Sequence, residues 1–149
     1  MRIALVTEVY PPRAGGAGWS ARALALALRA AGHEVGVLTT SPGPPDLDGL
    51  RVVRLQAEGR KRLALPRLFA RALRDEACDV VHAQHSLSAL GALAGPRPGR
   101  VAVTVRDHWP VCFWSTRVNQ GQLCPTCSLK NMLRCVQGRV PGPAFLAWG

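Results

Sequence analysis

The chain has 149 residues, 48% of them hydrophobic, and a formal net charge of +10 at pH 7. This length suits one domain, and the sequence has no apolar run of the roughly 18 residues that a transmembrane helix needs. A surface this basic favours anionic partners, which include phosphate groups, acidic lipid head groups and nucleic acid.

The N-terminal residues predict a strand, a glycine-rich loop, a helix and a second strand. The first strand is the apolar run at 3–7, which reads as buried on both faces. The loop after it contains three glycines, Gly15, Gly16 and Gly18. A helix rich in alanine and leucine is expected at 19–31 and ends at Gly32, before a strand at 35–39.

Strands and helices continue to alternate up to residue 105. After a proline-rich loop at 41–49, we expect strands at 50–55, 79–83 and 101–105, and helices at 63–76 and 86–94. The alternation predicts an α/β fold, a Rossmann-like doubly wound parallel sheet with helices on both faces. We expect this core at 1–105, a Cys-rich irregular insertion of the same domain at 106–140, and the start of a following segment, cut short, at 141–149.

The candidate site lies at one edge of this sheet. Ligands of open parallel sheets bind beyond the carboxyl ends of the strands, near the point where the strand order reverses. Loops that follow three of the strands carry the polar residues Glu8, Arg13, His82, His85, Arg106, Asp107, His108 and Trp109. The alternatives are that the two earlier histidines are core or loop residues and that Asp107 only caps its own turn.

The glycine loop has two interpretations. It is either a tight entry into the helix, or a place where missing side chains let a phosphate or sugar approach the backbone N–H groups. Its spacing is not the Gly-x-Gly-x-x-Gly of dinucleotide folds, and the strand at 35–39 lacks a terminal acidic residue for a ribose. Both observations argue against a nucleotide-dependent oxidoreductase.

Four cysteines are clustered in the insertion, as Cys112-x11-Cys124-x2-Cys127-x7-Cys135. The short Cys124–Cys127 spacing suits tetrahedral thiolate ligation, so a structural zinc site is one interpretation. An iron–sulfur cluster, two disulfides or reduced thiols are the others. Cys78 stands apart before a buried strand and reads as a core residue.

Several segments, in order, resemble one enzyme family. The opening MRIALVTEVYPPRAGGAGWS, the later DVVHAQH and the segment VTVRDHWPVC are similar to GT-B glycosyltransferases of the family-4 type. The resemblance implies two Rossmann-like domains, of which this chain would be the N-terminal, acceptor-binding one. It also implies transfer of a sugar from a nucleotide-sugar donor to an acceptor hydroxyl, with the donor bound mainly by a second domain. The chain alone would then be inactive.

The resemblance also suggests residue roles. Gly15 and Gly16 would lie under the donor diphosphate, and His82 and His85 would border the acceptor pocket. Family members often have a histidine where this chain has Arg106. Either His108 replaces that histidine, or Arg106 binds an anionic group, since an arginine cannot accept a proton at neutral pH.

The basic residues leave two further alternatives. Arg67, Arg71 and Arg74 share a helical face. This face is either simply solvated, or it contacts anionic lipids at the inner face of the membrane, as for a cytoplasmic, peripherally bound enzyme. A basic nucleic-acid-binding module with a zinc knuckle is the competing function. It requires aromatic residues interleaved with the basic ones, and the stretch at 60–74 has only Phe69.

Overall fold

The computed structural model describes residues 1–12, 15–59, 62–95, 99–112, 115–119, 121–124 and 126–139. The chain divides into two compact units, Met1–Thr104 and Val105–Gly149, and each is treated by itself. None of the helices in the described ranges is both long and apolar enough to cross a membrane.

The first unit is built on a six-stranded sheet with the order β3-β4-β2-β1-β5-β6. The strands are β1 (Arg2–Thr7), β2 (Glu34–Thr39), β3 (Asp46–Leu47), β4 (Leu50–Arg54), β5 (Val80–Ala83) and β6 (Arg100–Val103). Every neighbouring pair is parallel except β3 and β4. The predicted α/β class with a mostly parallel, Rossmann-like sheet is therefore confirmed.

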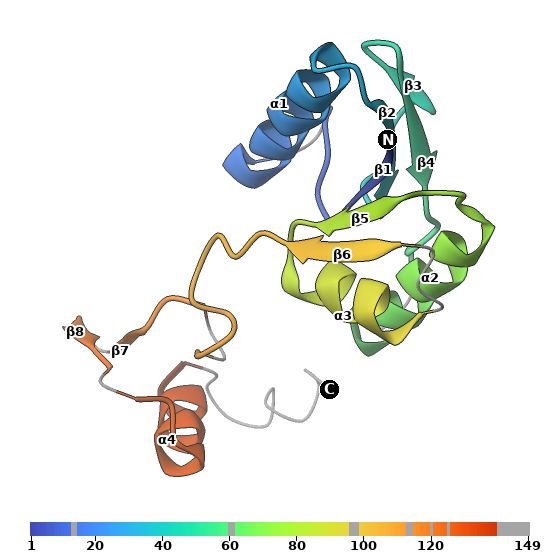
Figure 1. Cartoon of the computed structure of the whole chain (residues 1–149). Coiled ribbons are helices and arrows are strands. Elements are labelled where there is room, and N and C mark those ends of the chain that lie inside the picture. Colours follow the sequence, from blue (N-terminus) through green and yellow to red (C-terminus); the bar gives the residue numbers. More distant parts are fainter. Residues whose placement is uncertain are drawn as a thin grey trace. The chain divides into compact units, whose positions relative to one another are not determined.

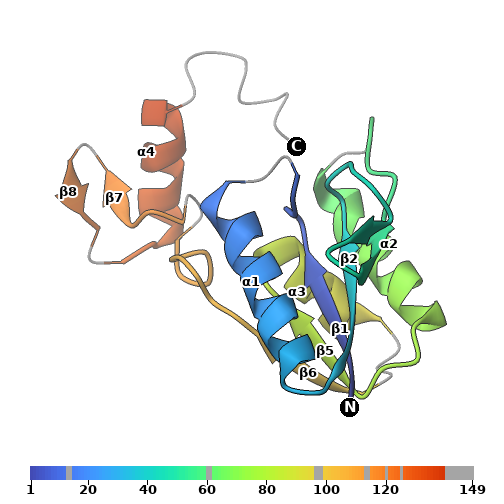
Figure 2. The same ribbon diagram turned by 90° about the horizontal axis from the view of Figure 1, so that it is seen from above.

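Helices cover both faces of this sheet (Figures 1 and 2). They are α1 (Gly16–Ala30), α2 (Leu65–Ala72) and α3 (Ser86–Ala94). On the α1 face, fully buried Leu5 and Val37 pack with the alanines Ala21 and Ala25, whose small side chains let the helix approach the strands. On the opposite face, α2 and α3 pack together, and α2 is extended at both ends by a 3₁₀ turn. The helix expected at 63–76 is thus three consecutive helical segments.

The C-terminus of α1 follows the prediction closely. Gly32 adopts a left-handed conformation with φ +83°, which suits a residue without a Cβ. Its N–H donates to the Arg29 carbonyl at 2.9 Å, and the His33 N–H donates to the Leu28 carbonyl at 3.2 Å. This pair of bonds is a Schellman motif, and it turns the chain from the helix into β2.

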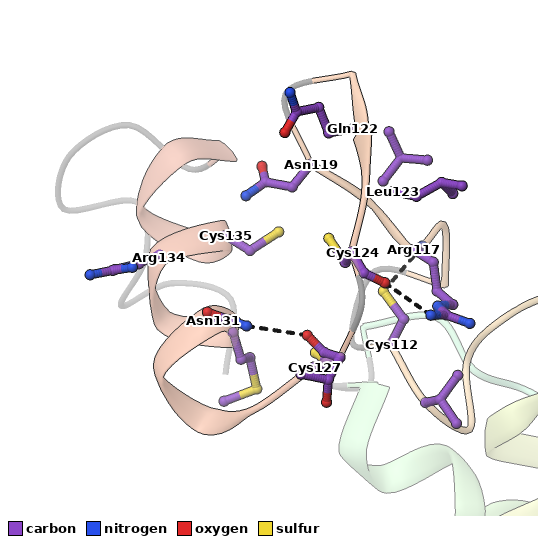
Figure 3. Close-up of a pocket in the computed structure, with 14 residues that line it drawn as sticks. Cys112, Arg117, Asn119, Gln122, Leu123, Cys124, Cys127, Asn131, Arg134 and Cys135 are labelled. Atoms are coloured by element: carbon purple, nitrogen blue, oxygen red, sulfur yellow. Dashed lines mark hydrogen bonds between the residues drawn. The ribbon is translucent and has the colours of Figure 1, made fainter.

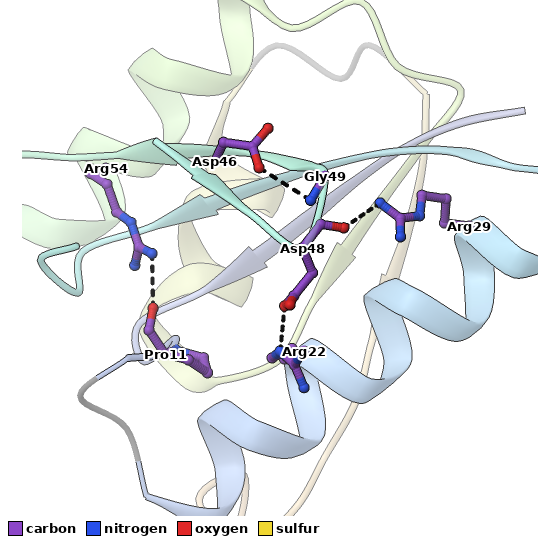
Figure 4. A network of polar contacts seen from close by, with 7 residues as sticks. All are labelled: Pro11, Arg22, Arg29, Asp46, Asp48, Gly49 and Arg54. Carbon is purple, nitrogen blue, oxygen red and sulfur yellow. Dashed lines mark hydrogen bonds and ion pairs between the residues drawn. The ribbon is translucent and has the colours of Figure 1, made fainter. Parts of the chain in front are cut away.

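A short hairpin occupies part of the loop expected at 41–49. Asp48 and Gly49 both have positive φ, 57° and 71°, and join β3 to β4 through a two-residue turn in which Leu47 pairs with Leu50. Arg22 donates to the Asp48 carboxylate at 2.6 Å, and this bond lowers the pKa of Asp48. Arg29 donates to the Asp48 carbonyl at 2.6 Å, so two arginines of α1 hold the turn (Figure 4).

The second unit contains regular elements that the sequence pattern did not predict. They are β7 (Val118–Asn119), β8 (Gln122–Leu123) and α4 (Leu129–Arg139). The two strands form an antiparallel hairpin, and the Ser128 hydroxyl caps α4 by accepting the Asn131 N–H at 3.3 Å. Among the described side chains of this unit, Val136 is the one buried hydrophobic residue. The described part of this unit therefore buries little apolar surface.

Candidate functional site

The sheet order places a switch point beside β1. The chain leaves β1 toward β2 and β4 on one side, then returns to lay β5 against the other side of β1. The loops that follow β1 and β5 therefore diverge at this point, at the carboxyl edge of the sheet. This is where open α/β sheets bind their ligands.

Glu8 lies at this switch point and contacts the start of α3. Its Oε1 accepts the Ser88 backbone N–H at 2.7 Å. Ser88 is in the first turn of α3, where unpaired N–H groups and the helix dipole favour a negative charge. Glu8, expected to bind donor or acceptor, thus has a defined structural contact that joins the loop after β1 to α3.

His85 is the N-cap residue of α3 and is held from two sides. Its backbone N–H donates to the Ser88 hydroxyl at 3.1 Å, and its Nδ1 lies 3.2 Å from the Thr7 hydroxyl oxygen. The Thr7 hydroxyl also donates to the Val9 carbonyl at 3.0 Å. Thr7 therefore joins the loop after β1 to the His85 ring at the start of α3.

His82 belongs to a different hydrogen-bonded group. It lies within β5 and is half-buried, and its Nε2 is 2.7 Å from the Thr104 hydroxyl oxygen. Gln84, fully buried, donates from Nε2 to the same oxygen at 3.4 Å. These contacts tie the end of β5 to the residue after β6, so the two predicted histidines of this edge have separate partners.

The glycines of the loop differ in what the fold requires of them. Gly18 is buried in α1. Gly15 is the N-cap and Gly16 the first residue of α1, and a Cβ added to either would meet nothing within 4 Å. Neither has a positive φ. Neither backbone conformation nor packing in the first unit therefore explains why these two positions are glycine. Arg13 lies outside the described residues.

The two helices that begin at this edge have different N-termini. The start of α3 receives the Glu8 carboxylate. The start of α1 has no acidic residue in its first turn and no side-chain capping bond from Gly15. Its positive end is therefore the better place for an external anion. Trp19, 49% exposed, lies in the first turn with the Arg22 guanidinium carbon 5.5 Å from its ring centre.

Arg54 supports the edge and was missed by the sequence prediction. Its guanidinium donates to the carbonyls of Pro11, Ser41 and Pro44 at 2.8, 3.1 and 3.0 Å. One side chain thereby joins the loop after β1 to the loop after β2 (Figure 4). Burial lowers the pKa of Arg54, although it stays charged. Thr7 was missed as well, and only its position at the end of β1 could have indicated it.

Arg106, Asp107, His108 and Trp109 belong to the second unit. The first three are exposed. The Asp107 Oδ1 accepts the Trp109 backbone N–H at 2.9 Å, which is the local capping considered as the alternative for this residue. The His108 N–H donates to the Ser115 carbonyl at 3.1 Å. The catalytic role of these residues stays a prediction.

The chain was compared with known protein families. The family model described as Glycosyltransferase Family 4 matches residues 14–129, which include the three glycines of the loop, both histidines of the β5 region and three of the four clustered cysteines. The chain belongs to glycosyltransferase family 4. The predicted family is thus confirmed.

The alternative function, a nucleic-acid-binding module, lacks structural support. Phe69 is the single aromatic residue of the stretch at 60–74, and because it is fully buried it cannot stack on a base.

The fold of this family-4 chain has a relative among solved structures. Sucrose-phosphate synthase (tll1590) from Thermosynechococcus elongatus matches with a TM-score of 0.59 and 24% sequence identity. The match covers 82% of this chain and 37% of that chain, so the family-4 chain spans little more than a third of its structural relative. The likeness confirms the Rossmann-like half of a GT-B fold. No curated protein matches the sequence significantly.

Proposed function

We propose that this chain is the acceptor-binding half of a glycosyltransferase that moves a sugar from a nucleotide-sugar donor to an acceptor hydroxyl. A second domain would supply most contacts to the donor, including its carboxylates and basic residues. Membership of family 4 supports the reaction class. Under this proposal residues 1–149 do not turn over alone, and measurable glycosyl transfer by the chain by itself would contradict it.

The start of α1 carries the proposal. Gly15 and Gly16 are required neither by backbone conformation nor by packing among the described residues, yet both lack a side chain at a helix start whose first turn has no acidic residue. A diphosphate that approaches the backbone N–H groups accounts for both facts, because it fills the space of the missing side chains and carries the negative charge that the helix start favours.

The other edge residues would serve the acceptor. His85, held at the start of α3 beside Thr7, would border the acceptor pocket. His82 would border the acceptor pocket as well. Glu8 would position the start of α3, and with it His85, through its bond to the Ser88 N–H. The second unit is considered by itself: there Arg106 would hold an anionic group, His108 would assist proton transfer, and Asp107 would fix its own turn.

Changing Gly16 to alanine separates function from folding. In an enzyme that carries both halves, we expect kcat/KM to fall about tenfold or more, since a 1.4 kcal/mol loss of binding to the transition state gives that factor. The thermal midpoint should hold or rise slightly, because alanine is the better helix former and its Cβ meets nothing. Steady-state kinetics and thermal unfolding measure the two effects.

The matched control is Gly36→Ala in β2, where the added Cβ would meet only the flexible end of the Arg51 side chain at 3.4 Å. It should leave both kinetics and stability nearly unchanged. Unaltered kinetics in Gly16→Ala would remove the glycine loop from the donor site. As a direct probe, inorganic pyrophosphate added to this chain should shift the amide NMR signals of residues 16–18, and no shift would count against the diphosphate.

We also propose that the outer side of α2 contacts an anionic membrane surface, as for a cytoplasmic enzyme that acts on a lipid-linked acceptor. Arg67, Arg71 and Arg74 are all exposed, and Leu63 just before the helix is 75% exposed. On α3, which packs against α2, Leu90 is 52% exposed. Arginines beside exposed leucines suit a surface with acidic head groups above an apolar layer.

Sedimentation with vesicles tests this contact. The chain should bind vesicles with phosphatidylserine more tightly than neutral ones, and Arg71→Glu should weaken binding by about 1 kcal/mol or more, roughly fivefold or more. Arg100→Glu makes the same charge change at the exposed amino end of β6 and should have a smaller effect. Equal binding to both vesicle types, or equal losses in both variants, would contradict a contact through α2.

A further inference from the structure

The strongest unassigned feature is one pocket of the second unit. It has a volume of about 270 Å³, and its lining includes Cys112, Cys124, Cys127 and Cys135 (Figure 3). Three different local structures contribute these residues. Cys112 precedes the hairpin, Cys124 and Cys127 follow β8, and Cys135 lies within α4. Residues separated by as many as 23 positions thus meet around one space.

The structure links these segments through backbone contacts. The Cys124 N–H donates to the Arg117 carbonyl at 2.8 Å, beside the hairpin pair Val118 and Leu123. The Arg117 N–H in turn donates to the Cys112 sulfur at 3.4 Å. An N–H···S bond of this kind stabilises a thiolate, and such bonds are typical around thiolate ligands of metals.

The turn that carries Cys127 is fixed to α4. The Asn131 side chain donates to the Thr126 carbonyl at 3.3 Å, and its backbone N–H donates to the Ser128 hydroxyl at 3.3 Å. Cys135 follows one turn of the helix later. The hairpin and the helix therefore hold the four sulfur-bearing residues on two sides of the same pocket.

The described residues of the second unit bury little apolar surface. Val136 is its one buried hydrophobic side chain among the described residues, whereas Val111, Leu123 and Leu129 are 58, 80 and 70% exposed. Small segments with so little apolar burial usually depend on a metal, disulfides or association. All five cysteines of the chain are present as thiols rather than as disulfides.

We infer that these four cysteines bind one structural zinc ion that holds the second unit together. In the described part of the structure, no three Cys, His, Asp or Glu side chains stand close enough to hold an ion. Bound zinc would draw the thiolates to Zn–S distances of about 2.3 Å, and its binding would be coupled to the ordering of this unit.

The balance of the binding step is simple. Four S–H bonds break, four S–Zn bonds form, and four protons pass to the solvent, with no change of oxidation state. The site then carries two net negative charges. Arg117 and Arg134, which also line the pocket, supply compensating positive charge. The inference stands independently of the proposed sugar transfer.

Metal analysis of the purified full chain is the test. We expect about one zinc per chain after gel filtration, as for a closed four-cysteine site. Each of the variants Cys112→Ser, Cys124→Ser, Cys127→Ser and Cys135→Ser should retain at least tenfold less zinc under the same conditions. Cys78→Ala, a thiol removed from the first unit, should keep the full amount.

Two further measurements separate ligation from general unfolding. Cys135→His should still bind Co²⁺ with a tetrahedral visible spectrum but with weaker sulfur-to-cobalt charge transfer, because one thiolate is replaced by imidazole. Far-UV circular dichroism should show that the first unit keeps its structure in every serine variant.

Other outcomes would overturn the inference. They are zinc retained in the serine variants, iron with acid-labile sulfide, a mass lowered by the four hydrogens of two disulfides, or a zinc-free chain whose second unit is fully protected from hydrogen exchange.

Discussion

Phe69→Ala is expected to lower the free energy of unfolding of the first unit by about 3–5 kcal/mol. Phe69 is fully buried in α2 and is one of the largest enclosed side chains of the chain. It lies between α2 and α3, where its Cβ is within 2.6 Å of the Cβ position that Gly91 lacks. Helices that pack this closely cannot collapse further to fill the cavity, so the cost should be near the upper end of the range.

Chemical denaturation followed by far-UV circular dichroism measures this loss. Leu63→Ala is the matched control, since Leu63 lies just before the same helix but is 75% exposed. Its effect should stay within about 0.5 kcal/mol. If the two variants unfold at the same denaturant concentration, the α2–α3 layer does not contribute to the core in the way described.

Gly99→Ala should lower the free energy of unfolding by about 3 kcal/mol, more than the other glycine-to-alanine changes considered. A Cβ at this position would lie 2.1 Å from the Asp79 carbonyl oxygen and 2.4 Å from its carbon. Asp79 cannot retreat, because its N–H donates to the Arg2 carbonyl at 2.8 Å and its carboxylate accepts the Arg2 N–H at 2.7 Å. The methyl group must therefore push β6 away from β5.

Gly36→Ala provides the comparison within the same sheet. Its Cβ would meet only the movable guanidinium of Arg51, so the change should be neutral or slightly stabilising. Thermal unfolding of both variants measures the contrast. Hydrogen exchange in Gly99→Ala should also rise first in β6. A melting temperature of Gly99→Ala equal to that of the parent chain would refute the close contact.

The sequence predicted most of the first unit because local and tertiary preferences agree there. The apolar runs of β1 and β2 predict strands that are buried on both faces, and helices do cover both faces of the sheet. Gly32 ends α1 where a left-handed φ is needed. The α3 boundaries were predicted to the residue, since His85 and Gly95 flank a run of small apolar residues.

The remainder depended on weaker or non-local signals. The Asp48-Gly49 pair is a strong indicator of a two-residue hairpin turn, but the surrounding prolines favoured a loop. The second unit was predicted to be irregular, although Leu129, Met132, Leu133 and Val136 of α4 follow the i, i+3, i+4, i+7 spacing of a helix. Its elements follow from capping by Ser128 and a glycine turn at Gly121, which are short-range signals.

Candidate site residues were predictable by position but not by partner. Knowing that the loops after β1 and β5 start at the same edge of the sheet was enough to select Glu8 and His85. That Glu8 would cap α3, and that Thr7 would contact the His85 ring, depends on distances between strands that the sequence does not contain. Arg54 acts at the edge from β4, a strand whose own loop carried no candidate.

The central place of β1 has a consequence for the order in which the protein can form. β1 pairs with β2, which follows within 40 residues, but its second neighbour is β5 at Val80–Ala83. During synthesis, one side of the most apolar strand must therefore stay without its partner until about half of the chain has been made. Until then that side is a template for pairing with another chain, and the nascent protein depends on speed or on chaperones to keep it covered.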